Sequence, residues 1–160
     1  MIPLEISEKL KQALVCLTFK TLSASDFVAD LGEHLSSSPA LQDHSDLVLL
    51  YGTAPDDRES LLAQLTKIVA VSYPDFSLEG AESAKIAESS LILMAKKFVE
   101  TEASGIELCV AATYVAGAHH VAYRLSDVCS ALVMGVHPMP TELDADQIAQ
   151  IKAAAVDFLS

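Results

Sequence analysis

Apolar residues recur every three or four positions along most of the chain, and this helical period constrains the fold more than any other feature of the sequence. In residues 4–22, one helix face carries Leu4, Leu10, Leu14, Leu17, Thr21 and Leu22. We expect Lys9, Lys11 and Lys20 near the edges of that face. No stretch shows the convincing alternation of apolar and polar residues that a half-buried β-strand requires. The sequence therefore predicts an all-α protein.

Turn residues between the periodic stretches divide the chain into six to eight expected helices. The period predicts helices over 26–35, 58–72, 80–100 and about 144–158, and a shorter element over 41–52 that would also suit a strand. Asp56 and Asp57 are expected to cap the helix that begins at residue 58. The most apolar segment, 106–136, is either one helix about 45 Å long or two helices broken near Gly117.

The length of the chain favours a single domain over 1–160. A chain of roughly 150 residues buries about 70% of the surface that it exposes when unfolded. The break at 74–80 could separate two helical halves, but each would have a small core, and one joint core is therefore the expectation. We predict a bundle around an apolar central helix or helix pair at about 106–136. The small residues of that segment would also suit a homodimer seam.

Charge restricts the classes of partner. The chain has 22 acidic and 10 basic residues, a net charge of −12, whereas a direct nucleic-acid binder needs a basic stripe. Between Lys20 and Arg58 there are seven acidic residues and no Lys or Arg. We predict that part of this tract docks a basic protein partner, and that the contact is made by Asp26, Asp30, Glu33, Asp43 and Asp46. The alternative is an ordinary solvated face.

A histidine pair in the apolar segment is the strongest candidate for ligand chemistry. Adjacent residues on a helix point about 100° apart, so His119 and His120 cannot chelate one ion as two histidines four residues apart can. We expect His119 in the core, bonded to a carbonyl or carboxylate. His120 shares a more polar stripe with other candidate ligand residues, Cys109, Tyr123 and Asp127. In a continuous helix Cys109 and His120 would lie about 16 Å apart and could not share an ion.

No motif indicates catalysis, a cofactor or a metal. Nucleophile-elbow, phosphate-cradle and paired-cysteine patterns do not occur. The cysteines Cys16, Cys109 and Cys129 are few and widely spaced, and we expect them to be reduced thiols in a cytoplasmic chain. The longest stretch without a charged residue, 108–123, is shorter than the roughly 20 residues of a membrane-spanning helix.

These observations favour a non-enzymatic interaction protein that binds and inhibits or escorts a basic partner. In size, charge and lack of catalytic motifs the chain is similar, at the level of class only, to bacterial immunity proteins, antitoxin-like inhibitors and secretion chaperones. The alternative is a helical small-molecule-binding or sensory domain with a cavity near His120, Tyr123 and Cys109. An enzyme whose active site is assembled from distant helices would leave no local motif and is a third reading.

Overall fold

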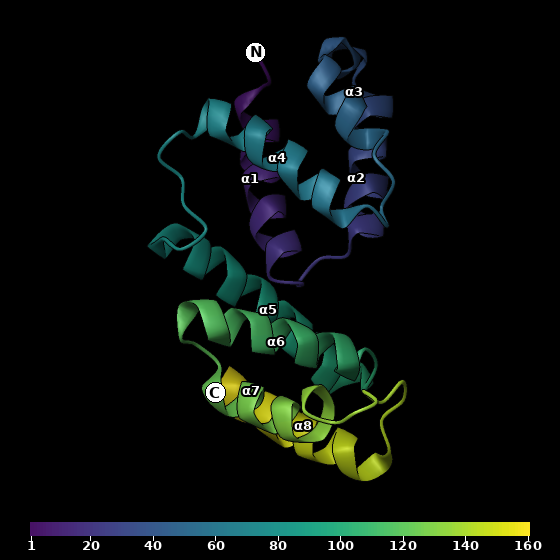
Figure 1. The fold of residues 1–160 in the computed structure, drawn as a ribbon, viewed down its shortest axis with the longest axis vertical. Helices are drawn as coiled ribbons and strands as arrows, with labels where there is room; N and C mark the ends of the chain where they lie inside the picture. The colour runs from purple at the N-terminus through teal and green to yellow at the C-terminus, as the bar shows by residue number, and fades with distance from the viewer. The chain divides into compact units, whose positions relative to one another are not determined.

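The structure, a computed structural model, describes residues 1–160, and every regular element is helical (Figure 1). The α-helices are α1 (Leu4–Thr18), α2 (Ala24–Ser37), α3 (Ser45–Tyr51), α4 (Arg58–Ser72), α5 (Ala81–Thr101), α6 (Gly105–His119), α7 (Tyr123–Cys129) and α8 (Ala145–Leu159). A 3-10 helix, η1 (Pro39–Asp43), and a short π-helical segment, η2 (Ser130–Met134), complete the set. The prediction of an all-α protein is confirmed, and 41–52 is helical rather than a strand.

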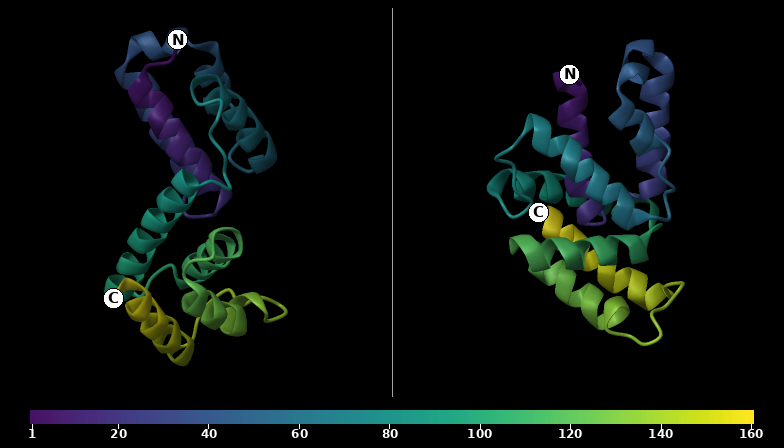
Figure 2. Two further views of the ribbon diagram at one scale, coloured as in Figure 1. Left: turned by 90° about the vertical axis from the view of Figure 1, so that its left-hand side faces the viewer. Right: turned by 45° about the horizontal axis from the view of Figure 1, so that its top comes forward.

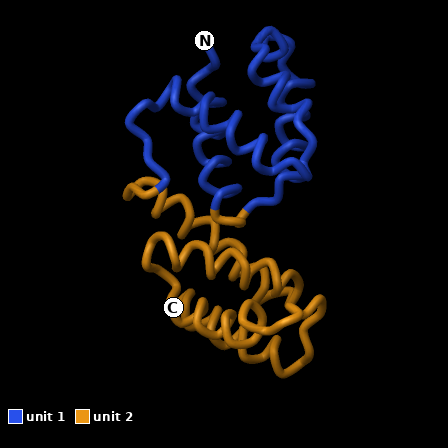
Figure 3. The backbone as a smooth tube through the Cα atoms, in the orientation of Figure 1, with its two compact units in different colours: residues 1–18, 22–78 blue, residues 19–21, 79–160 orange.

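The chain divides into two compact units, each of which is described by itself (Figure 3). Unit 1 comprises Met1–Thr18 and Leu22–Leu78 and contains α1 to α4. Unit 2 comprises Phe19–Thr21 and Glu79–Ser160 and contains α5 to α8. The boundary between Leu78 and Glu79 falls within the break at 74–80 noted in the sequence. One joint core for the whole chain stays a prediction.

Unit 1 is built around an apolar cluster to which all four of its α-helices contribute. α4 packs along α1, and α3 contacts both α2 and α4 (Figure 2). The ring of Tyr51 on α3 lies directly against Gly32 on α2, where an added Cβ would come 2.7 Å from the ring. Glycine at position 32 therefore permits the close approach of α3 to α2.

The buried side chain of Lys11 links the start of unit 1 to its end. The expectation that Lys11 lies at the edge of the helix face is therefore wrong. Its ammonium lies 2.9 Å from Glu8 Oε2 and 4.1 Å from the centroid of the Tyr73 ring. The Tyr73 hydroxyl donates to Glu8 Oε2 at 2.9 Å. The hydrogen bond from Lys11 lowers the pKa of Glu8 below its ordinary 4.5; partial burial opposes this, and the Tyr73 bond adds to it. Burying the lysine is tolerated because its charge is paired.

Helices that begin at a capping side chain start close to the predicted residue. Asp57 accepts from the Ser60 N–H at 3.3 Å and caps α4, as predicted. The end of α1 is different: the predicted face extends to Leu22, but the helix stops at Thr18 because Lys20 adopts a left-handed φ of 65°. Leu22 therefore lies outside α1.

Unit 2 is a four-helix arrangement in which each helix packs against two others. α5 contacts α6 and α8, and α7 contacts the same two helices (Figure 1). The segment 106–136 forms α6, α7 and η2, so two helices rather than one are present. The break lies at 120–122, where His120 and Ala122 have φ of 57° and 59°, and not at Gly117. None of the helices in the chain has the length and apolar composition needed to cross a bilayer.

α6 is the most buried helix of unit 2, but it is not covered on all sides. It contributes seven buried residues, against five from the longer α5. Ala111, Ala112 and Ala116 face the interior, whereas Tyr114 and the following small residues Gly117 and Ala118 are exposed. The prediction that small residues admit a neighbouring helix holds for the three buried alanines.

A disulfide joins α6 to α7, and the prediction of three reduced thiols is therefore wrong for two cysteines. Cys109 and Cys129 are both fully buried, and their Cα atoms are 4.9 Å apart. The turn at 120–122 lies midway between them in sequence, so the two helices fold back and bring the two positions together. Cys16 in unit 1 is outside the disulfide.

Candidate functional site

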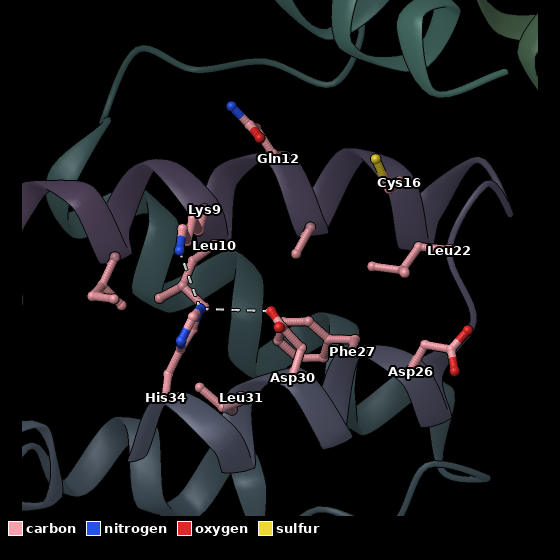
Figure 4. A pocket seen from close by; sticks show the side chains of 12 residues that line it. Lys9, Leu10, Gln12, Cys16, Leu22, Asp26, Phe27, Asp30, Leu31 and His34 are labelled. Atoms are coloured by element: carbon pink, nitrogen blue, oxygen red, sulfur yellow. Dashed lines mark hydrogen bonds and ion pairs between the residues drawn. The ribbon is translucent and has the colours of Figure 1, made fainter. Parts of the chain in front are cut away.

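An apolar groove of about 490 Å³ runs between α1 and α2 in unit 1 (Figure 4). Its apolar lining consists of Ile6, Leu10, Ala13, Leu22, Phe27 and Leu31. Lys9, Asp26, Asp30 and His34 supply charged or titratable groups. Gln12 and Cys16 border the groove from α1, and their side chains point away from α2 (Figure 4). The groove therefore combines an apolar floor with a polar rim, the usual composition of a binding site.

The helical period of each wall explains why the floor is apolar. Ile6, Leu10 and Ala13 follow one another at spacings of four and three on α1, and Phe27 and Leu31 are four apart on α2. All except Ile6 are buried and belong to the apolar cluster of unit 1. The floor of the groove is thus the outer layer of a packed core, which fixes its shape.

Polar side chains from both helices meet at one end of the groove. Lys9 Nζ lies 3.3 Å from His34 Nε2, and this nitrogen is 3.7 Å from Asp30 Oδ2 (Figure 4). The Lys9 ammonium and the Asp30 carboxylate therefore approach the same ring nitrogen of His34. At the other end, the Leu22 N–H donates to the Cys16 carbonyl at 3.2 Å, next to Asp26. α1 and α2 therefore run in opposite directions along the groove.

The five acidic residues predicted to form a docking surface are all exposed, but only two of them line the groove. Asp26 and Asp30 lie one turn apart on the α2 wall. Glu33 continues the same ridge outside the groove. Asp43 and Asp46 belong to η1 and α3, which pack on another side of α2. The tract without basic residues in sequence has a basic neighbour in space, because Lys9 of α1 reaches the α2 wall.

Sequence reasoning placed Lys9 near the edge of an apolar helix face but assigned neither Lys9 nor His34 to a site. The spacing of four between Asp30 and His34 was visible in the sequence, and it is the signal that could have marked this turn of α2. No sequence signal pairs Lys9 with His34, which is 25 positions away. Leu22, counted on the face of α1, enters the groove from the segment that follows the helix.

The second predicted site, in the apolar segment, is not assembled around Cys109. That residue is fully buried in the disulfide and lies near the start of α6, whereas His120 follows the last residue of the helix. His120 and Tyr123 are exposed, with ring centroids 6.1 Å apart. Asp127 is exposed one turn further along α7. The structure brings His120 to Tyr123 and leaves Cys109 apart from both.

His119 of unit 2 is half-buried and lacks the hydrogen bond expected of it. Its ring meets the Phe19 ring edge-on at a centroid distance of 4.8 Å, and its Nε2 is buried with no hydrogen-bond partner. The two histidines occupy different environments, as their adjacent positions predicted. No group of three or more His, Cys, Asp or Glu side chains in the molecule is arranged to hold a metal ion.

Comparison of the chain with protein-family models, curated proteins and solved structures finds no match. No relative therefore assigns roles to the residues of the groove. The groove between α1 and α2 combines an apolar floor with charged side chains on its rim, and the function proposed below rests on it.

Proposed function

We propose that unit 1 is a protein-binding module whose groove accepts a basic amphipathic helix of a partner protein. The observation that carries this proposal is the apolar groove between α1 and α2 with Asp26 and Asp30 on one wall. In this mode of recognition an apolar helix face fills a hydrophobic groove, and flanking charges select the partner. The chain would act by binding, and so inhibit or escort its partner, rather than by catalysis.

The dimensions of the groove suit a short helix. Its lining on α1 extends from Ile6 to Cys16, eleven residues and so about 15 Å of helix. This is close to three turns of a bound helix at about 5.4 Å per turn. Apolar anchors at spacings of three and four on the partner would meet the two apolar walls.

The charge of unit 1 selects a basic helix rather than an acidic one. Unit 1 contains eleven acidic and four basic residues, a net charge of −7. Three of the four basic side chains have partners within the unit. Lys11 pairs with Glu8, Arg58 donates to the Leu17 and Thr18 carbonyls, and Lys9 lies beside His34. Complementary charge speeds association and sets orientation.

The acidic residues outside the groove would attract the partner by long-range electrostatics without contacting it. Glu33, Asp43 and Asp46 contribute to the negative potential around α2 and α3. Asp26 and Asp30, one turn apart, would face two basic residues four positions apart on the partner helix. The five predicted acidic residues would thus divide into two contact residues and three steering residues.

The proposed function does not depend on whether the protein is in a reducing or an oxidising compartment. The expectation of a cytoplasmic chain rested on reduced cysteines, and the disulfide between Cys109 and Cys129 removes that support. Binding in the groove requires neither cysteine. The proposed function therefore holds in an oxidising or a reducing compartment.

The test uses synthetic helical peptides of about four turns with a leucine stripe, flanked either by lysines or by glutamates. Fluorescence anisotropy at low salt should show binding of the lysine peptide and little of the glutamate peptide. The double variant Asp26→Lys/Asp30→Lys should weaken binding of the lysine peptide by about tenfold or more. Its salt dependence should also become flatter.

A matched variant carries the same change in net charge outside the groove. Asp43→Lys/Asp46→Lys should slow association and change the equilibrium affinity by only about threefold. Equal effects of the two double variants, or equal binding of the two peptides, would contradict the proposal. Self-association of the chain, measured in the same buffer by sedimentation, would instead identify a second copy as the occupant.

A further inference from the structure

The groove of unit 1 carries different charges at its two ends. At one end Lys9 Nζ lies 3.3 Å from His34 Nε2 (Figure 4). At the other end Asp26 stands beside Leu22, where the chain passes from α1 to α2. Asp30 lies between the two ends, 3.7 Å from His34 Nε2, and no basic side chain lines the groove beside Asp26.

We infer that the partner helix lies in the groove in one direction, with its N-terminus at the Asp26 end and its C-terminus at the Lys9–His34 end. This inference rests on the proposed function, since it concerns the same groove and the same partner class. The bound helix would run parallel to α2 and antiparallel to α1. It is the direction, and not only the composition, of the partner that the groove would select.

The helix macrodipole is the physical cause of this preference. A helix has partial positive charge at its N-terminus and partial negative charge at its C-terminus, so a carboxylate favours the first and an ammonium the second. Asp26 and Lys9 are placed to satisfy both ends at once in one direction, and to oppose both in the other. Two such end effects at an exposed rim correspond to a preference of about tenfold.

The dipoles of the two walls do not decide the direction. α1 and α2 are 15 and 14 residues long and run in opposite directions along the groove, so their macrodipoles largely cancel there. The side chains at the two ends are left to set the polarity. Leu10, Ala13, Phe27 and Leu31 are apolar and are indifferent to the direction of the partner.

The chain provides a natural position for a probe of direction. Cys16 is the one cysteine outside the disulfide, it lies at the Asp26 end, and its side chain points away from α2 (Figure 4). A bimane fluorophore attached there reports on the Asp26 end, and anisotropy of the labelled protein checks that the groove still binds peptide. The chain contains no tryptophan, so a tryptophan on a peptide is the only indole available to quench the bimane.

The experiment compares two lysine-flanked leucine-stripe peptides that differ only in carrying tryptophan at the N-terminus or at the C-terminus. Both should bind the labelled protein with equal affinity by anisotropy, but the N-terminal tryptophan should quench the bimane about tenfold more effectively. In the charge-exchange variant Lys9→Glu/Asp26→Lys, the C-terminal tryptophan should become the better quencher.

Three outcomes decide the matter. Equal quenching by the two bound peptides, or stronger quenching by the C-terminal tryptophan in the wild type, would overturn the inference while the proposed function stands. Quenching that does not change in the charge-exchange variant would show that Lys9 and Asp26 do not set the direction. Absence of binding in the anisotropy measurement would overturn the proposed function and this inference with it.

Discussion

The two units hold their helices together by different means. Unit 1 relies on an apolar cluster and on the buried Lys11–Glu8 pair, and it leaves a groove between two of its helices. Unit 2 joins two of its four helices by a disulfide. Binding surfaces are drawn from the less constrained parts of proteins, because an opening between helices leaves apolar surface uncovered. The contrast supports the proposal that unit 1, rather than the disulfide-linked unit 2, binds the partner.

Removing the disulfide should produce the largest effect and should fall on unit 2. Closing a loop of about 20 residues is worth about 3 kcal/mol in the chain-entropy account, so Cys109→Ala/Cys129→Ala should lose about this much unfolding free energy. Denaturant unfolding under non-reducing conditions measures the loss. A single shifted transition would agree with one joint core, whereas two transitions, only one of them shifted, would contradict it.

Cys16→Ala is the matched control because that cysteine is not in the disulfide; its cost should be under about 1 kcal/mol. Peptide binding in the groove should be unchanged in the double variant. Three titratable thiols in the unfolded, unreduced wild type would show that no disulfide had formed.

Replacing the buried lysine of unit 1 should have an intermediate effect. Lys11→Met keeps the aliphatic stem but removes the ion pair and the contact with the Tyr73 ring. Because the Glu8 side chain is 43% exposed, water can solvate the carboxylate that remains, and we expect a loss of about 1 to 2 kcal/mol. Lys152→Met, at the exposed pair with Glu102, should cost less than about 0.5 kcal/mol. An equal loss of unfolding free energy in the two variants would show that the buried ion pair of unit 1 stabilises no more than the exposed pair of unit 2.

The same substitution should change how stability depends on pH. The pKa of Glu8 is lowered in the folded protein from its ordinary 4.5, so its ionised form stabilises the fold at pH values above 4.5. This contribution is lost as the pH falls below 4.5 and the carboxylate takes up a proton. Lys11→Met should therefore show a smaller loss of stability than the wild type over that acid range, as measured by denaturant unfolding at a series of pH values. Parallel pH profiles would contradict the role assigned to the pair.

The smallest predicted effect is a gain of stability at the turn between α6 and α7. Ala122 has a left-handed φ of 59°, which costs an alanine roughly 1 to 2 kcal/mol and a glycine almost nothing. Ala122→Gly should therefore raise the unfolding free energy by about 0.5 to 1 kcal/mol. Ala149→Gly, at an exposed position within α8, should lower it by about 1 kcal/mol. A loss in both variants would show that the turn is not strained.

Local signals in the sequence were sufficient for most of the helices. The spacing of leucines and the Asp57 cap predict α4 at its observed bounds, because both act within one or two turns of chain. The end of α1 was missed because a left-handed residue such as Lys20 has no signature when it is not glycine or asparagine. The disulfide was missed because its two cysteines are 20 positions apart and meet only after a turn has formed.

The candidate site was predicted in part, since the sequence shows charge along a helix but not what lies opposite it. Asp26 and Asp30 were identified from the acidic tract, and both line the groove. The groove itself depends on the separation of α1 and α2, which no periodicity encodes. Because of Lys9, the groove is not uniformly acidic: it has a basic group at one end and an acidic group at the other. Only the tertiary structure shows that Lys9 faces His34.

Residues Phe19–Thr21 belong to unit 2 although they connect two helices of unit 1. The polypeptide consequently crosses from one unit to the other three times, after Thr18, after Thr21 and after Leu78. A recombination event that transferred residues 1–78 to another gene would separate Phe19 from the His119 ring that it contacts. The segment 1–78 contains the whole groove of unit 1 but also three residues of unit 2, so no single cut in the sequence separates the two units.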